Sequence, residues 1–105
     1  MEQFKVDDIL VGTWGYSMVI PEFFEVKKVN AKTATVRRLA KKMLKPNACG
    51  QQGYEVPVEP RRSDEREFEG TARMTESGWC VKMEYGTRVF VEKWNEQPVW
   101  ADYMD

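Results

Sequence analysis

The stretch EFFEVKKVNAKTATVRRLA, residues 22–40, has two runs of strand-forming residues on either side of a short polar segment. Valine, threonine and phenylalanine recur in both runs, and β-branched and aromatic residues are enriched in strands. Asn30 favours a turn because its side chain can hydrogen-bond to nearby backbone. The pattern predicts a β-hairpin with its turn at residues 30–33. Two basic doublets interrupt the alternation, which predicts a bulge or a strong twist.

Other short strand-like runs lie on both sides of this hairpin. They cover residues 8–16, 69–75, 79–85 and 88–94, with turns at residues 76–78 and near Gly86. Residues 54–60 also have an extended pattern, but their two prolines favour an edge strand or an excursion. Residues 40–45 predict one helical turn that Pro46 ends.

These elements predict a mainly β fold. We expect a small antiparallel, SH3-like barrel of about five to six strands with a short helical turn, because closure removes the exposed edges of a flat sheet. An OB-type barrel is the alternative, and a five-stranded sheet packed against one helix fits less well, since no stretch has a long period of 3.6. The 105 residues predict a single domain, 1–105, whose C-terminal tail folds back over one end of the sheet.

The composition is that of a globular protein, with 42% hydrophobic and 12% aromatic residues. The longest apolar runs are about four or five residues, too short to span a membrane. The N-terminus begins MEQFK and lacks the basic and then apolar segments of a signal peptide. We therefore expect the protein in the cytoplasm.

The chain has two cysteines, Cys49 and Cys80, and no histidine. Their spacing fits no metal motif, and a zinc site would need further ligands that only carboxylates could supply. The sequence predicts free thiols, no metal and no cofactor.

Catalytic chemistry is not evident in the sequence. Histidine, the commonest acid–base group, is absent, and a cysteine nucleophile would lack its usual imidazole partner. Asp7 and Asp8 would point to opposite faces of a strand. The charged segment 61–67 alternates acids and bases and is typical of a solvated loop. Gly12 and Gly15 lack the lysine of a phosphate-binding loop. We expect a protein that is not an enzyme.

Charge is distributed unevenly along a chain whose net charge is only −1. Residues 27–45 contain eight basic side chains and no acidic one, whereas the segments before and after have net charges of −4 and −5. One interpretation is an ordinary solvated hairpin whose lysines prevent unwanted strand pairing. The other is a cationic surface for phosphates or for an acidic protein. The candidate residues of this surface are Lys27, Lys28, Lys32, Arg37, Arg38, Lys41, Lys42 and Lys45.

Two further surfaces are candidates for partner binding. The acidic remainder of the chain could imitate a phosphate track and occupy the basic groove of another protein, or simply keep the surface soluble. The apolar segment Met18-Val19-Ile20 follows Tyr16, and an exposed apolar loop with an aromatic residue is typical of an interface anchor. Tyr16, Met18 and Ile20 are therefore added to the partner-binding candidates.

The chain also resembles a family of small proteins encoded by bacteriophages and conjugative elements. The matching residues are Asp8-Ile9, Trp14-Gly15-Tyr16, Phe23-Phe24-Glu25-Val26, Lys32-Thr33-Ala34-Thr35-Val36-Arg37, Val56-Pro57, Trp94, Pro98 and Tyr103. Two features depart from the family pattern: Asp7 replaces a glycine, and residues 17–21 are apolar where the family has a polar segment. The matches are aromatic residues, valines and turns, so the resemblance implies shared architecture more than shared activity.

The resemblance implies an accessory gene of a mobile element, expressed in a bacterial cytoplasm. Non-catalytic proteins of this size in that setting often block host defences, anti-CRISPR inhibitors among them. We therefore expect a protein that binds and inhibits a host protein, such as the CRISPR effector Cas9 or another defence nuclease. The alternatives are a DNA- or RNA-binding module that uses residues 27–45, and a structural protein of the virion.

Overall fold

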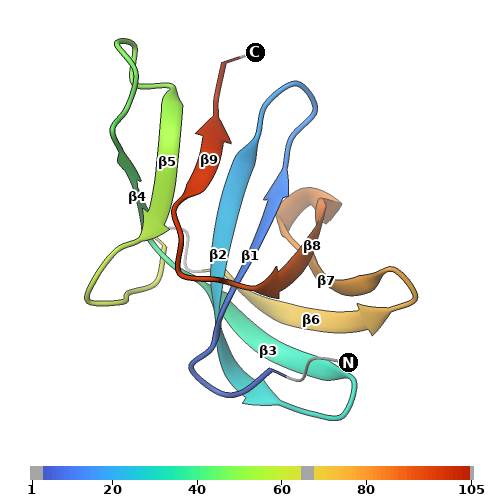
Figure 1. Ribbon diagram of the computed structural model, residues 1–105. Coiled ribbons are helices and arrows are strands. Elements are labelled where there is room, and N and C mark those ends of the chain that lie inside the picture. The colour runs from blue at the N-terminus through green and yellow to red at the C-terminus, as the bar shows by residue number, and fades with distance from the viewer. Residues whose placement is uncertain (1–3, 65–67, 105) are drawn as a thin grey trace.

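The computed structural model describes residues 4–64 and 68–104, and these residues form two antiparallel sheets. The first is a closed barrel in the order β1-β2-β3-β6-β7-β8. Its strands are β1 (Ile9–Trp14), β2 (Ile20–Val29), β3 (Thr33–Arg38), β6 (Glu69–Thr75), β7 (Gly78–Lys82) and β8 (Arg88–Lys93). The second sheet has the order β4-β5-β9 (Figure 1). Its strands are β4 (Lys41–Leu44), β5 (Gln52–Pro57) and β9 (Val99–Asp102).

The predicted mainly β fold with a small antiparallel barrel is confirmed. The prediction of a helical turn at residues 40–45 is wrong, because this segment is strand β4 and pairs with β5. The helical turn lies instead at Glu84–Gly86, between β7 and β8. Strand β5 is the central strand of its sheet and not an edge, and Pro57 is its last residue. Strand pairing has outweighed the local preference in both segments: β4 pairs with the next strand along the chain, and β5 also pairs with the distant β9.

The hairpin formed by β2 and β3 has its turn where the sequence predicted it. The backbone N–H of Asn30 donates to the carbonyl of Thr33 at 2.8 Å. The register runs through Val26↔Val36 and shifts by one residue before Lys28↔Thr35, so the expected bulge is present. Beyond this bulge β2 becomes exposed on both faces.

The barrel core is made of the inward-facing residues of all six strands. Leu10, Phe24, Val36 and Val81 are fully buried there, and Phe4 packs against them from the N-terminal segment. Along β3 every second residue is buried, the period expected of a strand with one face in a core.

Barrel closure brings β1 very close to β8. A Cβ atom placed on Gly12 would lie 2.3 Å from the carbonyl oxygen of Phe90 and 2.5 Å from a methyl carbon of Val89. Only glycine leaves room for this approach.

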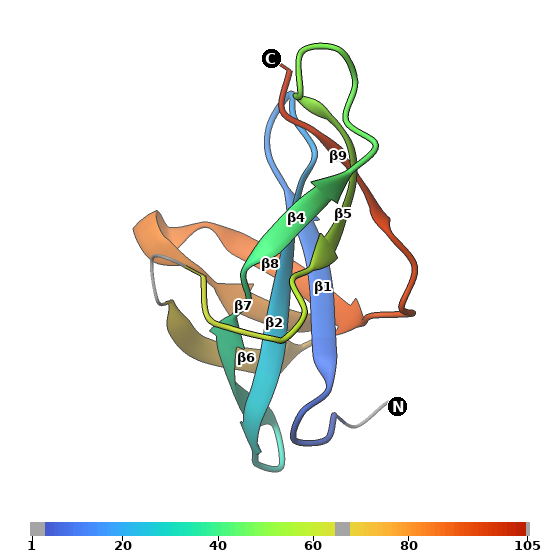
Figure 2. The ribbon, with the colours of Figure 1, turned by 90° about the vertical axis from the view of Figure 1, so that its left-hand side faces the viewer.

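The second sheet is attached beside the barrel by both backbone and side chains. Val19, in the β1–β2 loop, exchanges two backbone hydrogen bonds of 2.8 Å with Asp102 on β9. The C-terminal tail thus lies between β5 and the loop that leads into β2. Figures 1 and 2 show this sheet beside the end of the barrel from which the β1–β2 loop extends. In the described segments, no helix is long and apolar enough to span a bilayer.

Candidate functional site

The structure divides the basic block between the interior and the surface. Arg38 is only 2% exposed, and the side chain of Lys41 is 17% exposed. The prediction that all eight basic residues share one cationic surface is therefore wrong for these two. Arg38 is buried because it lies on the same face of β3 as Ala34 and Val36, which point into the core. This period of two was already present in the sequence.

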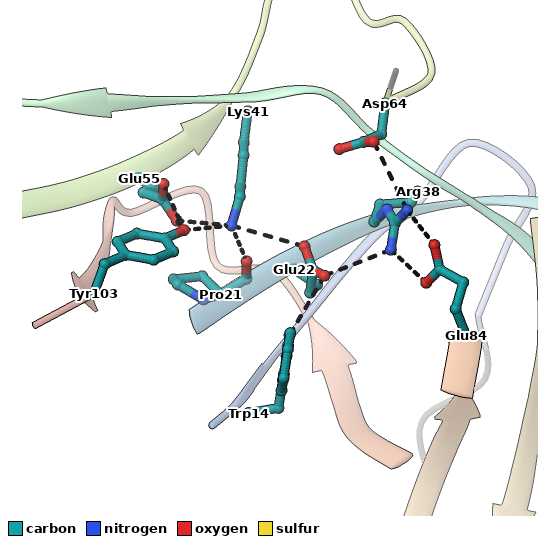
Figure 3. Close-up of polar contacts among 9 residues, drawn as sticks. All are labelled: Trp14, Pro21, Glu22, Arg38, Lys41, Glu55, Asp64, Glu84 and Tyr103. Atoms are coloured by element: carbon teal, nitrogen blue, oxygen red, sulfur yellow. Dashed lines mark hydrogen bonds and ion pairs between the residues drawn. The ribbon is translucent and has the colours of Figure 1, made fainter. Parts of the chain in front are cut away.

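Arg38 is held by acidic side chains around it. Its two terminal nitrogens each donate a hydrogen bond of 2.8 Å to Glu84 (Figure 3). Nη1 also lies 3.7 Å from Glu22, and Nη2 lies 3.7 Å from Asp64. The guanidinium also stands 5.3 Å from the ring centre of Phe68. The hydrogen bonds to Glu84 raise the pKa of Arg38, with burial acting in the opposite direction. Arg38 is thus a compensated interior cation.

Lys41 occupies the centre of a second group of polar side chains. Its Nζ lies 3.0 Å from Glu55 and 3.7 Å from Glu22, and it donates hydrogen bonds to the Pro21 carbonyl and, at 2.7 Å, to the Tyr103 hydroxyl. The Tyr103 hydroxyl in turn donates to Glu55 at 2.8 Å. Burial and the neighbouring Glu55 carboxylate raise the pKa of Tyr103 well above its ordinary value.

Glu22 joins the two groups. It lies between Lys41 and Arg38, 3.7 Å from each, and accepts a hydrogen bond of 3.4 Å from the indole of Trp14. Burial raises the pKa of Glu22, although both cations act to lower it. The result is one ionic network that connects the barrel to β4, to β5 and to Tyr103, the residue after β9. Its members are Trp14, Glu22, Arg38, Lys41, Glu55, Asp64, Glu84 and Tyr103 (Figure 3).

Shifted pKa values also occur in structural ion networks, so they do not by themselves mark a catalytic centre. The two surface pockets described below are lined by none of the network's residues. We interpret the network as a joint that holds the second sheet on the barrel.

A second ionic cluster surrounds Glu25 on the outside of the β2–β3 hairpin. Arg37 donates to Glu25 at 2.7 Å, Arg61 at 3.0 Å, and Lys27 lies 3.8 Å away. Burial alone would raise the pKa of Glu25, but the hydrogen bonds from Arg61 and Arg37 outweigh it, and the pKa is lowered. One carboxylate therefore serves three cations: Arg37 is paired with Glu25, whereas the side chain of Lys27 is 47% exposed and the cluster keeps a net positive charge.

This cluster also changes the interpretation of the charged loop. Residues 61–67 were expected to be a solvated loop, yet Arg61 contacts Glu25, Ser63 accepts a hydrogen bond from Arg37, and Asp64 lies near Arg38. Arg61 is exposed as expected although it pairs with Glu25, whereas the expectation of a solvated segment is wrong for Ser63 and Asp64, which are partly buried against the barrel. Residues 65–67 lie outside the described residues.

The remaining candidate lysines are exposed but separated. Lys28 and Lys32 lie at the β2–β3 turn, whereas Lys42 and Lys45 lie on β4 and directly after it. Figures 1 and 2 both show this turn at the bottom of the molecule and β4 in its upper half. The described residues therefore do not gather the block into one patch.

The candidate loop between β1 and β2 does project into solvent. Tyr16 is fully exposed and Val19 is 37% exposed, whereas Met18 and Ile20 are partly buried. Gly15, with φ of +124°, provides the turn. Tyr16 is thus a free aromatic side chain, and Met18 and Ile20 are less accessible than the sequence suggested.

An aromatic surface that the sequence did not reveal lies on the outer face of the second sheet. Leu44, Tyr54 and Trp100 are cross-strand neighbours and form a row over all three strands, hereafter the aromatic row. Tyr54 is 47% and Trp100 43% exposed, and their rings meet edge to face with centres 5.4 Å apart. The opposite face has Glu55 and Ala101, which are buried against the barrel. Only the register of β5 with β9 brings the two rings together.

Trp100 also borders a groove of about 1090 Å³ beside the barrel. Its wall includes Val11 of β1, Trp79 of β7 and Phe90 of β8, whose side chain is half-exposed. The acids Glu76 and Glu92, the base Lys93 and several neutral polar residues also line it. A smaller pocket of about 400 Å³ lies near Asp8 and Arg61.

The possible metal ligands and the two cysteines were each located in the structure. Over residues 4–64 and 68–104, no three His, Cys, Asp or Glu side chains are arranged to hold a metal ion. Cys49 is exposed, Cys80 is half-buried, and both are free thiols.

Comparison with protein-family models, with curated proteins and with solved structures found no match to this chain. The geometry described above is therefore the basis for inferring function.

Proposed function

We propose that the chain is a non-catalytic domain that binds a protein partner through the aromatic row. The observation that supports this most directly is the exposed pair Tyr54 and Trp100 on a sheet face turned to solvent. The solvated face of an antiparallel sheet is normally polar. Tyrosine and tryptophan are the residues most often found at the energetic centre of protein interfaces.

The β1–β2 loop extends the same surface. The paired hydrogen bonds between Val19 and Asp102 hold this loop beside β9, which contains Trp100. Tyr16, which is fully exposed in this loop, is a further candidate anchor. Both aromatic groups stand on strands or a short loop fixed by backbone pairing, which lowers the entropic cost of binding.

The resemblance to proteins of phages and conjugative elements suggests what kind of protein the partner is. On this basis the partner is a host protein that the domain blocks, with a defence nuclease such as a CRISPR effector as the specific candidate. Direct binding of nucleic acid is less well supported, because Arg38 and Lys41 are buried in ion pairs and the exposed lysines form two separate groups, one at the β2–β3 turn and one on and after β4.

The test is an affinity capture from lysate of a bacterial host, followed by identification of bound proteins and a binding measurement with the purified partner. The double variant Tyr54→Ser, Trp100→Ser should weaken this binding about a hundredfold or more, since such anchors contribute roughly 2 kcal/mol each. The control is Val29→Ser, which removes an exposed apolar residue from the distant β2–β3 hairpin and should bind normally.

Three results would contradict the proposal. They are full binding by the double variant, turnover of a substrate by the purified chain, and salt-sensitive binding of DNA or RNA that is tighter than the binding of any protein captured.

A further inference from the structure

The β4–β5–β9 sheet has an open edge at β4. In the segments that the structure describes, β4 pairs with β5 alone, whereas each barrel strand has two neighbours. Figures 1 and 2 both show β4 on the outside of the molecule with no strand beyond it. An unpaired edge presents backbone donors and acceptors to other chains.

The register identifies the backbone groups that face this edge. Residue pairs in an antiparallel ladder alternate between hydrogen-bonded and non-hydrogen-bonded. Pro57 has no N–H, so its pair with Lys41 is of the non-hydrogen-bonded kind, and so is the pair Met43↔Glu55 two residues on. The next pair, Ala40 and Val58, is joined by a bond from the N–H of Val58 to the carbonyl of Ala40, as the alternation requires. The N–H and C=O groups of Lys41 and Met43 therefore point away from β5.

The side chains beside this edge indicate the chemistry of an added strand. Lys42 is exposed on the outer face and Lys45 follows the strand end, where its φ of +50° turns the chain. The charge of Lys41, by contrast, is balanced by Glu55 on the inner face. An incoming strand would also extend the aromatic row beyond Leu44, since neighbouring strands lie about 4.8 Å apart.

We propose that the open edge of β4 binds an extended, acidic segment of the partner protein by strand addition. The proposal rests on the function proposed above and specifies how the partner is held. Backbone bonds to Lys41 and Met43 supply register, while Lys42 and Lys45 select carboxylates. A second copy of the chain is a poorer occupant, because a symmetric β4–β4 pair brings these lysines near their own copies.

The test uses labelled synthetic peptides with the intact chain. One peptide of ten residues alternates valine and glutamate, and its control alternates valine and lysine. We expect the acidic peptide to bind at least about tenfold more tightly at low salt, and this difference to shrink at about 0.3 M salt. It should slow amide hydrogen exchange at Lys41 and Met43, with little effect at Lys42, whose N–H is already in the ladder.

A matched pair of variants tests the backbone contact. Met43→Pro removes an N–H that faces the open edge, a position where edge strands accept proline, and Met43→Ala removes the same side chain but keeps the N–H. We expect Met43→Pro to bind the acidic peptide about tenfold more weakly than Met43→Ala. The double variant Lys42→Glu, Lys45→Glu changes only exposed residues and should abolish the preference for the acidic peptide, so it tests the proposal even if the proline variant misfolds.

Equal binding of the two peptides, equal binding by the proline and alanine variants, or tighter binding of a thymidine oligonucleotide would each overturn strand addition at β4. The two proposals fail separately. If the captured partner depends on Tyr54 and Trp100 but binds the Met43→Pro and Met43→Ala variants alike, strand addition is wrong and the proposed function remains.

Discussion

Glu84 accepts two hydrogen bonds from the guanidinium of Arg38, both at 2.8 Å, across 46 residues of sequence. This pairing ties the helical turn before β8 to strand β3. The planar guanidinium fits both carboxylate oxygens at once, which makes the contact directional as well as charged. Because Arg38 is also near Glu22, the same side chain connects the barrel to the second sheet through the ionic network.

Replacing Arg38 should therefore destabilise the whole molecule. Arg38→Met removes the guanidinium that donates to Glu84 and leaves Glu22 with Lys41 as its neighbouring cation, and we expect the free energy of unfolding to fall by about 3 kcal/mol. Arg38→Lys keeps the positive charge but not the two parallel hydrogen bonds of the guanidinium, so its free energy of unfolding should fall less than that of Arg38→Met. The measurement is the urea midpoint at constant slope. Arg73→Met, at an exposed position on β6, is the control and should change stability by less than about 0.5 kcal/mol. Equal losses in the two methionine variants would contradict the network.

Glu25 should stabilise the fold above its ordinary pKa. Its folded-state pKa lies below 4.5, so its contribution is present above 4.5 and is lost as the pH falls through the lowered value. At pH 7 we expect Glu25→Gln to be about 1 kcal/mol less stable than the wild type, a modest figure because Arg37 and Arg61 are partly solvated. In unfolding experiments across pH, this difference should disappear at acidic pH. A constant difference would show that Glu25 acts only by packing.

Glu22 should show the opposite dependence on pH. Its folded-state pKa is raised above 4.5, so its contribution is complete below 4.5 and is lost as the pH rises through the raised value. Glu22→Gln does not titrate, so the variant should gain stability relative to the wild type as the pH increases. The same unfolding series measures this. Parallel curves for the variant and the wild type would mean that Lys41 and Arg38 fully compensate the cost of burial.

The sequence was sufficient for the local parts of the fold. The β2–β3 hairpin, its bulge and the strands of the barrel followed from alternation, turn residues and the doubled basic residues. Strand β4 could not be recognised in this way, because the segment has no period of its own and becomes a strand only through its pairing with β5. The same applies to β5, whose prolines suggested an edge, although Pro57 ends a central strand.

The candidate site was harder to predict than the fold. The basic block was visible as a run of residues, but whether a cation is solvated depends on acids that are distant in the chain, such as Glu84 for Arg38. The position of Arg38 two residues after Val36 was a local signal of burial that charge counting obscured. Tyr54 and Trp100 form a pair only because β9 returns to lie beside β5. No short-range pattern contains that register.

Gly12 should be indispensable to barrel closure. Gly12→Ala puts a methyl group against the Phe90 carbonyl and Val89 on β8. Because a paired backbone carbonyl cannot shift without disturbing the strand, we expect the free energy of unfolding to fall by about 2–3 kcal/mol. Gly70→Ala is the comparison, because the nearest atoms to its methyl group belong to the side chain of Phe68 and not to backbone, so we expect a smaller loss. Thermal unfolding compares the two, and amide exchange in β1 and β8 should accelerate in the Gly12 variant alone. If Gly12→Ala were as stable as Gly70→Ala, the close approach of β1 and β8 would not be a feature of the folded protein.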